Sequence, residues 1–199
     1  TDIAIVSAQG GEVTNITGSG YFSTGPRWTP DGNAIVFSTD RYGMRSHASW
    51  GSLSDVMMVF MNQDAYDKYK LSKEDYELLK ELEKQQKKDK EETDKKDDKK
   101  KDSKKDDKSS DKKTDDKKKD DKKKDIVVEL DGISDRIVRI TRNSSDVYDA
   151  VVEGSGESLY YTTAGEKGID VMKVDLRKRE EKKVGSAKSG SIDCDKDGK

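Results

Sequence analysis

The sequence contains few of the residues that build cross-linked, metal-bound or membrane-spanning proteins. It has one cysteine, Cys194, and one histidine, His47, among its 199 residues. A single cysteine excludes an internal disulfide, and a single histidine beside it excludes a Cys/His zinc cluster. No run of about 18 apolar residues occurs, so no membrane-spanning helix is expected. The composition therefore predicts a chain without a metal or other cofactor and without a membrane span.

Apolar residues are also scarce, and one long segment lacks them altogether. Only 30% of the residues are hydrophobic, whereas 41% are charged. Residues 84–125 comprise 20 lysines, 15 acidic residues and 7 Gln, Ser or Thr residues. A segment with no apolar side chain to bury cannot offset the entropy lost on ordering. The sequence therefore predicts a disordered, Lys/Asp-rich linker over 84–125.

The charge of this linker argues against nucleic acid as a partner. The whole chain carries a formal charge of −2, and residues 84–125 alone carry +5 with the two signs closely interleaved. Little positive potential then extends beyond a Debye length of about 8 Å in physiological salt. The linker also has no aromatic residue that could stack on a base. We expect a solvated linker rather than a nucleic-acid-binding tail.

The residues before the linker have the pattern of a helix. Ser72 is a good N-cap residue, and Asp75 stands at the third helical position, where it can complete a capping box. Apolar residues including Leu79 and Leu82 then recur at three- and four-residue spacing. The sequence predicts a short inserted amphipathic helix within 63–83, beginning near Ser72.

Two glycine turns mark a repeat. The stretches "RWTPDGNAIVFSTD" (27–40) and "AVVEGSGESLYYTT" (150–163) superpose when Gly32 is aligned with Gly156. Each has the pattern of a strand, a tight turn and a second strand rich in β-branched and aromatic residues. Gly198 follows Gly156 by 42 residues, and a four-stranded propeller blade needs a period of about 40–45. The predicted turn positions are Trp28, Asp31, Gly32, Gly156, Asp197 and Gly198, and we interpret Trp28 as a residue that packs within its blade.

The remaining strands repeat as well. An Asp-led strand opens the stretches "DIAIVSAQGGEVTNIT", "SDVMMVFMN" and "DVMKVDLRKREEKKV", and "DRIVRIT" resembles the last strand of a blade. The predicted fold class is all-β: a partial β-propeller of four-stranded antiparallel blades, formed by 1–62 and 126–199. The helix within 63–83 and the linker 84–125 are expected to be inserted into one blade. Such an insertion costs mainly loop-closure entropy, which grows only slowly with length.

The last seven residues, "DCDKDGK", also fit the first half of a calcium loop. Acidic residues occupy alternate positions from Asp193, and Gly198 is sixth. A complete loop would need a glutamate six residues beyond Gly198, outside this chain. We favour a hairpin turn, because Asp197-Gly198 is in phase with the turn at Gly32 and supplies the positive φ that such turns require. A calcium-binding module remains the alternative.

Three stretches resemble a known family. "PRWTPDGNAIVFSTDRYG" followed by an Asp-led strand is similar to the propeller repeats of TolB and of tricorn-type proteases. "RYGMRSHASWGSLSDVMMVFMNQDAYDKYKLSKEDYELLKELEK" and "VVELDGISDRIVRIT" resemble the propeller region of tricorn-like serine peptidases, which carry a Lys/Asp-rich insertion at the same place. The resemblance covers nearly the whole chain outside 84–125.

The resemblance implies a role and partners. It implies a propeller that gates or guides peptide substrates towards a downstream PDZ-like and catalytic region of the same chain, in a protein that forms homo-oligomers. It implies a cytoplasmic location, or a periplasmic one if the natural protein has a signal peptide. We expect that Thr1 is not the natural N-terminus. The alternative is a TolB-like propeller that stands alone as a protein-interaction module.

The chain itself offers no complete catalytic site. His47 lies in "MRSHASWGS", near Ser46, Ser49 and Ser54, but a serine nucleophile needs a base at about 3 Å and a third group that orients the base. Sequence spacing supplies neither, so we expect no catalytic residue in this chain. The loop is longer than the matching link "AGEKG", and we predict that Arg45, His47 and Trp50 contact a peptide or a neighbouring domain.

Overall fold

The computed structural model describes residues 1–47, 50–86 and 126–195. The chain forms two compact units, one made of Thr1–Lys70 with Ile126–Lys199 and the other of Leu71–Asp125. The strands of the described residues all belong to the first unit, and the predicted linker 84–125 lies almost wholly outside the described residues.

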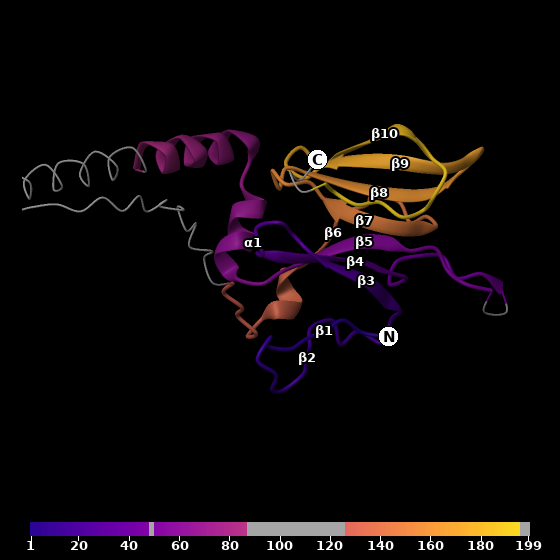
Figure 1. Cartoon of the computed structure of the whole chain (residues 1–199), viewed down its shortest axis with the longest axis horizontal. Helices are drawn as coiled ribbons and strands as arrows, with labels where there is room; N and C mark the ends of the chain where they lie inside the picture. The colour runs from indigo at the N-terminus through magenta and orange to yellow at the C-terminus, as the bar shows by residue number, and fades with distance from the viewer. Residues whose placement is uncertain (48–49, 87–125, 196–199) are drawn as a thin grey trace, which may run out of the picture. The chain divides into compact units, whose positions relative to one another are not determined.

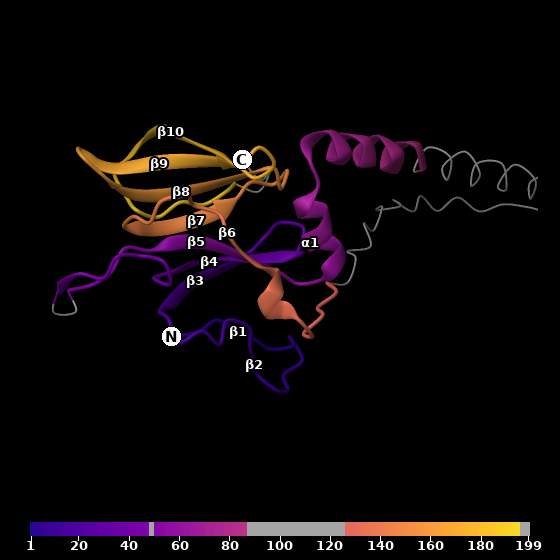
Figure 2. The same ribbon diagram turned by 180° about the vertical axis from the view of Figure 1, so that it is seen from behind.

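The first unit contains two four-stranded antiparallel sheets and one two-stranded sheet, which follow one another as layers (Figures 1 and 2). Each four-stranded sheet is ordered as the chain runs, apart from the insertion between β5 and β6. The sheets are β1(Ala4–Ile5)-β2(Thr14–Asn15), β3(Ser23–Trp28)-β4(Ala34–Thr39)-β5(Asp55–Phe60)-β6(Ile137–Arg139), and β7(Val147–Val152)-β8(Ser158–Gly165)-β9(Gly168–Asp175)-β10(Glu180–Ala187). The prediction of four-stranded antiparallel sheets of the blade kind is confirmed for these two sheets, and the described residues show no closed ring.

The same polar pair occurs in all three sheets. In each four-stranded sheet, an aspartate near the start of the third strand accepts a hydrogen bond from a hydroxyl side chain on or just after the fourth strand. In the two-stranded sheet, an aspartate just before β1 accepts one from a hydroxyl side chain just after β2. The three pairs are Asp2 with Thr17 (3.1 Å), Asp55 with Thr141 (2.9 Å) and Asp170 with Ser186 (3.4 Å). The strands β1 and β2 therefore correspond to the outer two strands of a blade, and the predicted Asp-led repeat is confirmed.

The sheet β3–β6 is buried on both faces. Strands β4 and β5 read AIVFST and DVMMVF, and such continuous apolar runs are typical of strands covered on both sides. One face packs on the sheet β7–β10 through Ala34, Val36, Val56, Met58, Phe60, Ile140, Ala150, Val152, Leu159, Tyr161, Val174 and Leu176. The other face packs towards β1 and β2 through Ile3, Ile16, Ile35, Phe37, Met57, Val59, Met61 and Ile133.

The two predicted glycine turns have the same geometry. Gly32 and Gly156 have φ values of 70° and 71°, and each amide donates to a carbonyl three residues back at 2.9 Å. Asp31 accepts hydrogen bonds from the Thr29 hydroxyl and the Asn33 amide at 2.6 and 3.1 Å. Burial would raise the pKa of Asp31, but these hydrogen bonds outweigh it and lower the pKa. Asp197 and Gly198 lie outside the described residues, so the third turn stays a prediction.

The interpretation of Trp28 as a packing residue is wrong for this chain. Its side chain is 48% exposed and belongs to neither apolar cluster. Trp28 pairs with Ile35, whose side chain lies on the face covered by β1 and β2. Those two short strands correspond to the outer half of a blade, so they do not extend over the inner strand that carries Trp28.

The described part of the insertion contains two α-helices, where the sequence predicted one helix within 63–83. Helix α1 (Gln63–Lys70) belongs to the first unit, and a helix over 73–86 belongs to the second. The predicted N-cap is confirmed: the Ser72 hydroxyl accepts from the Asp75 amide at 3.1 Å, and it also donates to the Asp75 carboxylate at 2.8 Å. The start of α1 uses the Asn62 side chain in the same way, accepting from the Ala65 amide at 2.8 Å. In the described part of the chain, neither helix has the length and apolar character needed to cross a bilayer.

Candidate functional site

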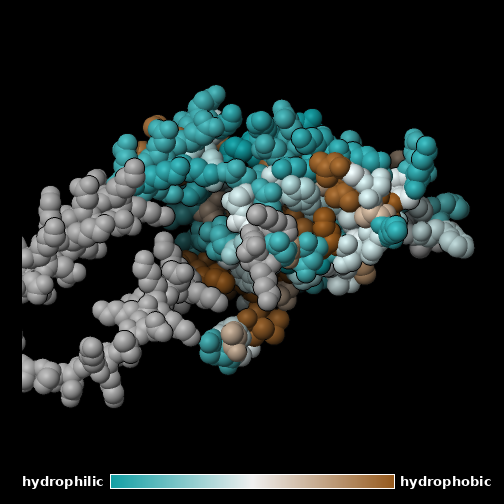
Figure 3. All heavy atoms as spheres, turned by 45° about the horizontal axis from the view of Figure 1, so that its top comes forward, coloured by the Kyte–Doolittle hydropathy of each residue, from teal (hydrophilic) through white to brown (hydrophobic). Residues whose placement is uncertain are grey.

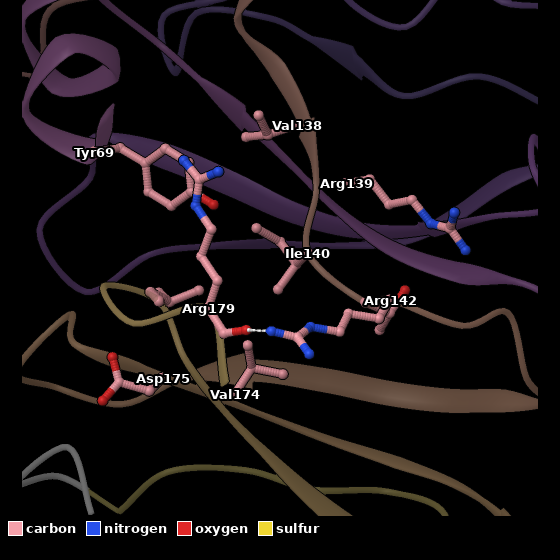
Figure 4. A pocket seen from close by; sticks show the side chains of 10 residues that line it. Tyr69, Val138, Arg139, Ile140, Arg142, Val174, Asp175 and Arg179 are labelled. Atoms are coloured by element: carbon pink, nitrogen blue, oxygen red, sulfur yellow. Dashed lines mark hydrogen bonds between the residues drawn. The ribbon is translucent and has the colours of Figure 1, made fainter. Parts of the chain in front are cut away.

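A groove of about 260 Å³ lies between the outer edge of the sheet β3–β6 and the end of β9 (Figure 4). We call it the edge groove. Its lining residues are Tyr69, Val138, Arg139, Ile140, Thr141, Arg142, Val174, Asp175, Leu176 and Arg179. Five of these are consecutive, so one wall of the edge groove is the end of strand β6 together with the three residues that follow it.

The outer side of strand β6 pairs with no other strand among the described residues. In the part of the chain that the structure describes, β6 pairs only with β5, through registers that include Met57↔Arg139 and Met58↔Val138. The Ile140 amide points towards β5 and donates to the Val56 carbonyl at 2.9 Å. Because backbone groups alternate in direction along an antiparallel strand, those of Arg139 point away from β5. The outer edge of β6 therefore presents strand hydrogen-bonding groups to the groove.

The opposite wall is a tight turn fixed by its own hydrogen bonds. The Asp175 carboxylate accepts from the amides of Arg177 and Lys178 at 3.0 and 2.8 Å, and the Arg179 amide donates to the Asp175 carbonyl at 2.8 Å. Burial opposes ionisation of Asp175, but these amide hydrogen bonds and the nearby lysines lower its pKa. Arg179 has a φ of 56°, a conformation that non-glycine residues rarely adopt. The turn thus holds Arg179 in a fixed place despite a backbone cost.

Two arginines and one tyrosine define the polar rim of the edge groove. The guanidinium of Arg142 donates to the Arg179 carbonyl at 2.7 Å, and the Arg179 guanidinium lies 5.7 Å from the centre of the Tyr69 ring (Figure 4). Burial raises the pKa of the Tyr69 hydroxyl, although the nearby Arg179 opposes this. Tyr69 is therefore neutral at physiological pH and can serve as an uncharged platform for the Arg179 cation.

The charge of the rim is positive, and the interior of the groove is apolar. In Figure 4 the side chains of Ile140 and Val174 face the space between Arg142 and Arg179, whereas Asp175 points away from it. Arg139 also turns away, because its guanidinium binds the buried carboxylate of Asp55 at 2.7 Å. This combination can hold an extended, partly apolar and negatively charged segment. It has no pair of groups placed for nucleophilic or acid–base chemistry.

The predicted contact residues lie on a different part of the molecule. Arg45, His47 and Trp50 occupy the hairpin loop between β4 and β5, which extends away from the sheets in Figure 1. The loop is closed by a bridge between Arg45 and Ser52. Trp50 is 85% exposed, and the neighbouring Met44 is 77% exposed. The structure brings the three predicted residues onto one projecting loop, and their role as contact residues stays a prediction.

The histidine has no catalytic partner within the described residues. His47 is exposed and forms no side-chain hydrogen bond with Ser46 or Ser54 in the described part of the loop, whereas Ser49 lies outside it. Among residues 1–47, 50–86 and 126–195, no group of three or more His, Cys, Asp or Glu side chains is placed to hold a metal ion. The calcium-loop alternative stays a prediction, because Asp197 and Gly198 fall outside these ranges.

The sequence did not reveal the edge groove. Tyr69, Arg142 and Arg179 come from three separate segments, and no local motif connects them. The one available signal is "DLRKRE", in which a tight turn between two predicted strands contains no glycine or asparagine. An arginine forced into a left-handed conformation there would have identified the turn as unusual.

Comparisons with known proteins support the fold alone. No protein-family model matches the chain, and no curated protein matches it in sequence. The crystal structure of the tricorn protease is similar with a TM-score of 0.55 and 10% identity, covering 99% of this chain and 16% of that chain. TolB from Acinetobacter baumannii gives a TM-score of 0.44 and 11% identity, covering 96% of this chain and 28% of that one. The chain thus spans about a sixth of the tricorn protease and shares with it four-stranded sheets of the propeller kind.

Proposed function

We propose that the chain is a non-catalytic part of the propeller of a larger, tricorn-like serine peptidase. In that protein it guides peptide substrates towards a catalytic domain encoded elsewhere in the same gene. The observation that supports this most is the fold similarity to the tricorn protease, which covers 99% of this chain. The resemblance of the sequence around the insertion, described above, points to the same family.

The projecting loop supplies a place for contact in this role. An exposed indole and a nearby arginine are typical of residues that anchor a partner peptide or domain. We propose that Arg45, His47 and Trp50 contact a peptide in transit or a neighbouring domain of the same chain. We further propose homo-oligomeric assembly and a cytoplasmic location, with the periplasm as the alternative.

The experiment is to express the full gene that encodes this chain and to label it with a fluorophosphonate probe, which reacts with activated serine nucleophiles. We expect the full-length protein to be labelled and the segment 1–199 to remain unlabelled. Peptide mapping should place the label downstream of residue 199. A matched pair of variants, Trp50→Ala and Lys167→Ala, tests whether the loop makes the proposed contact. Both side chains are exposed, but only Trp50 belongs to the loop.

A full-length protein that is not labelled, or a gene without a nucleophile-bearing domain, would overturn the peptidase proposal. The exposed side chains of Trp50 and Met44 then favour the second candidate, a stand-alone propeller that binds another protein through the loop between β4 and β5. In that case Trp50→Ala should abolish recovery of a partner that a Lys167→Ala variant retains.

A further inference from the structure

We propose that the edge groove is a binding site for an extended acidic peptide, which adds as a fifth strand to the free edge of β6. This inference does not rest on the proposed peptidase role, because it needs only residues of this chain. It also concerns a different surface from the loop that carries Arg45, His47 and Trp50.

The backbone of β6 is the first reason. Strand addition requires an unpaired edge whose amides and carbonyls can pair with the incoming chain. The backbone groups of Arg139 point to the outer side of β6, away from β5. This follows from the pairing of β6 with β5 and from the Ile140 amide, which donates to Val56 on β5. An edge strand of three residues matches an incoming segment of about 10 Å in extended conformation.

The space beside this edge is the second reason. A volume of about 260 Å³ borders the five consecutive residues 138–142. Its other wall carries Val174 and Leu176, which are buried residues of the core between the two sheets. An incoming strand would cover the partly buried Val138 and extend this core outwards.

Charge identifies the kind of peptide. The guanidinium groups of Arg142 and Arg179 stand at the rim, and both residues are exposed. Asp175 is already engaged by two amides of its own turn and points away from the groove. Arg142 uses one of its five N–H donors on the Arg179 carbonyl, so several remain for a carboxylate. Apolar residues flanked by Asp or Glu therefore suit the groove better than basic or uncharged sequences.

The surroundings make this site distinct from the general surface. Figure 3 shows that hydrophilic residues predominate on the visible face and that apolar residues form only small patches. A groove that joins an apolar interior, a free strand edge and two arginines is therefore a specific feature of the molecule. Sequence-independent backbone pairing would supply affinity, and the arginines would supply selectivity for acidic flanks.

The test measures binding of a fluorescein-labelled peptide, Asp-Glu-Val-Val-Val-Glu-Asp, to the intact chain by fluorescence anisotropy. We expect saturable binding that weakens as salt is raised. The same peptide with lysine in place of every acidic residue should bind at least about tenfold more weakly. A version N-methylated on the central valines should also lose binding, because it cannot pair with a strand edge.

Variants of the two rim arginines separate binding from folding. Arg179→Gly should weaken binding by about tenfold through loss of the guanidinium, while it suits the left-handed backbone and so preserves the thermal transition. Arg179→Lys should keep most of the affinity. Arg142→Ala should weaken binding like Arg179→Gly, and the control Lys167→Ala, at the far end of the second sheet, should leave it unchanged.

Three results would each overturn the proposal. These are absence of saturable binding, equal affinity for the acidic and lysine peptides, and equal affinity for the N-methylated peptide. Unchanged affinity in Arg179→Gly with an intact thermal transition would also exclude this groove as the site.

Discussion

The two four-stranded sheets share one plan and differ in how their third and fourth strands are joined. In the sheet β7–β10, β9 and β10 are linked by a tight turn over 176–179, whereas in β3–β6 the link runs from residue 61 to residue 136 and contains α1. Yet both sheets keep the pairing of the third-strand aspartate with a hydroxyl residue on or just after the fourth strand. The link between these strands can therefore change greatly while the pairing of the strands is preserved.

The sheets also differ in how deeply that aspartate is buried. The Asp55 side chain is fully buried and binds Arg139, Thr141 and Ser144. Asp170 is 20% exposed and binds the half-exposed Lys183 at 2.6 Å. The sheet with the long insertion thus holds its fourth strand with the stronger polar network.

The largest expected effect comes from removing the buried carboxylate. Asp55→Ala leaves the Arg139 guanidinium and the Thr141 hydroxyl without their partner, and should lower the free energy of unfolding by about 3–5 kcal/mol. Asp170→Ala should cost about 1 kcal/mol or less, because that pair is partly solvated. Urea denaturation measures both. Equal costs would show that the two networks contribute equally to stability, contrary to their burial.

A smaller effect is expected at the two glycine turns. Gly32→Ala and Gly156→Ala should each cost about 1 kcal/mol, because alanine is strained at the positive φ of these residues. A Cβ at Gly32 would lie 2.9 Å from Cγ1 of Ile126, whereas a Cβ at Gly156 would meet nothing within 4 Å. Gly32→Ala should therefore be the more destabilising of the two in thermal unfolding. Asparagine at either position serves as the control, since it tolerates this conformation better.

A third comparison concerns the contact between the first strands of the two sheets. The Arg27 guanidinium on β3 binds Asp149 on β7 at 2.9 Å and Asp193 at 3.2 Å. Arg27→Met keeps the apolar stem and removes the charge, and should cost no more than about 1 kcal/mol because the groups are partly exposed. The cost should shrink as salt is raised. A cost that does not depend on salt would indicate packing rather than charge.

The smallest effect is expected from shortening the insertion. Deleting 87–125 removes no apolar side chain and roughly halves the link between β5 and β6, a change worth about 0.6 kcal/mol in loop-closure entropy. The urea midpoint of the shortened chain should therefore be nearly that of the parent. A large loss of stability would show that the segment packs against the sheets, and would contradict the prediction made from its composition.

The repeat could be predicted because its signals are local and recur. The turns at Gly32 and Gly156 require a positive φ. In the strands after them, apolar residues are continuous where both faces of the sheet are buried and alternate with polar residues where only one face is buried. The N-cap at Ser72 could also be predicted from four consecutive residues. A helix was predicted within 63–83, but its division into α1 and a second helix was not. The stretch "QDAYDKYK" has two aromatic residues, Tyr66 and Tyr69, that pack on the sheet with ring centres 5.8 and 4.9 Å from that of Phe60.

The candidate site was harder to predict than the fold. The loop with Arg45, His47 and Trp50 could be located because it is a long polar link between two strands. The edge groove exists because the outer edge of β6 is not paired with another described strand. It also needs residues more than 30 positions apart in the sequence to lie close together. The exposure of Trp28 was mispredicted for a similar reason: composition favours burial of an indole, but the neighbouring strands decide it.

The separation between β5 and β6 has a consequence for how the molecule acquires its structure. Asp55 and Arg139 are 84 positions apart, whereas every strand of β7–β10 pairs with its immediate successor. Contacts between distant positions form slowly, because a long stretch of chain must be brought together before any energy is gained. The sheet β7–β10 should therefore fold first, and β6 should be the last strand to pair, with the free edge of β5.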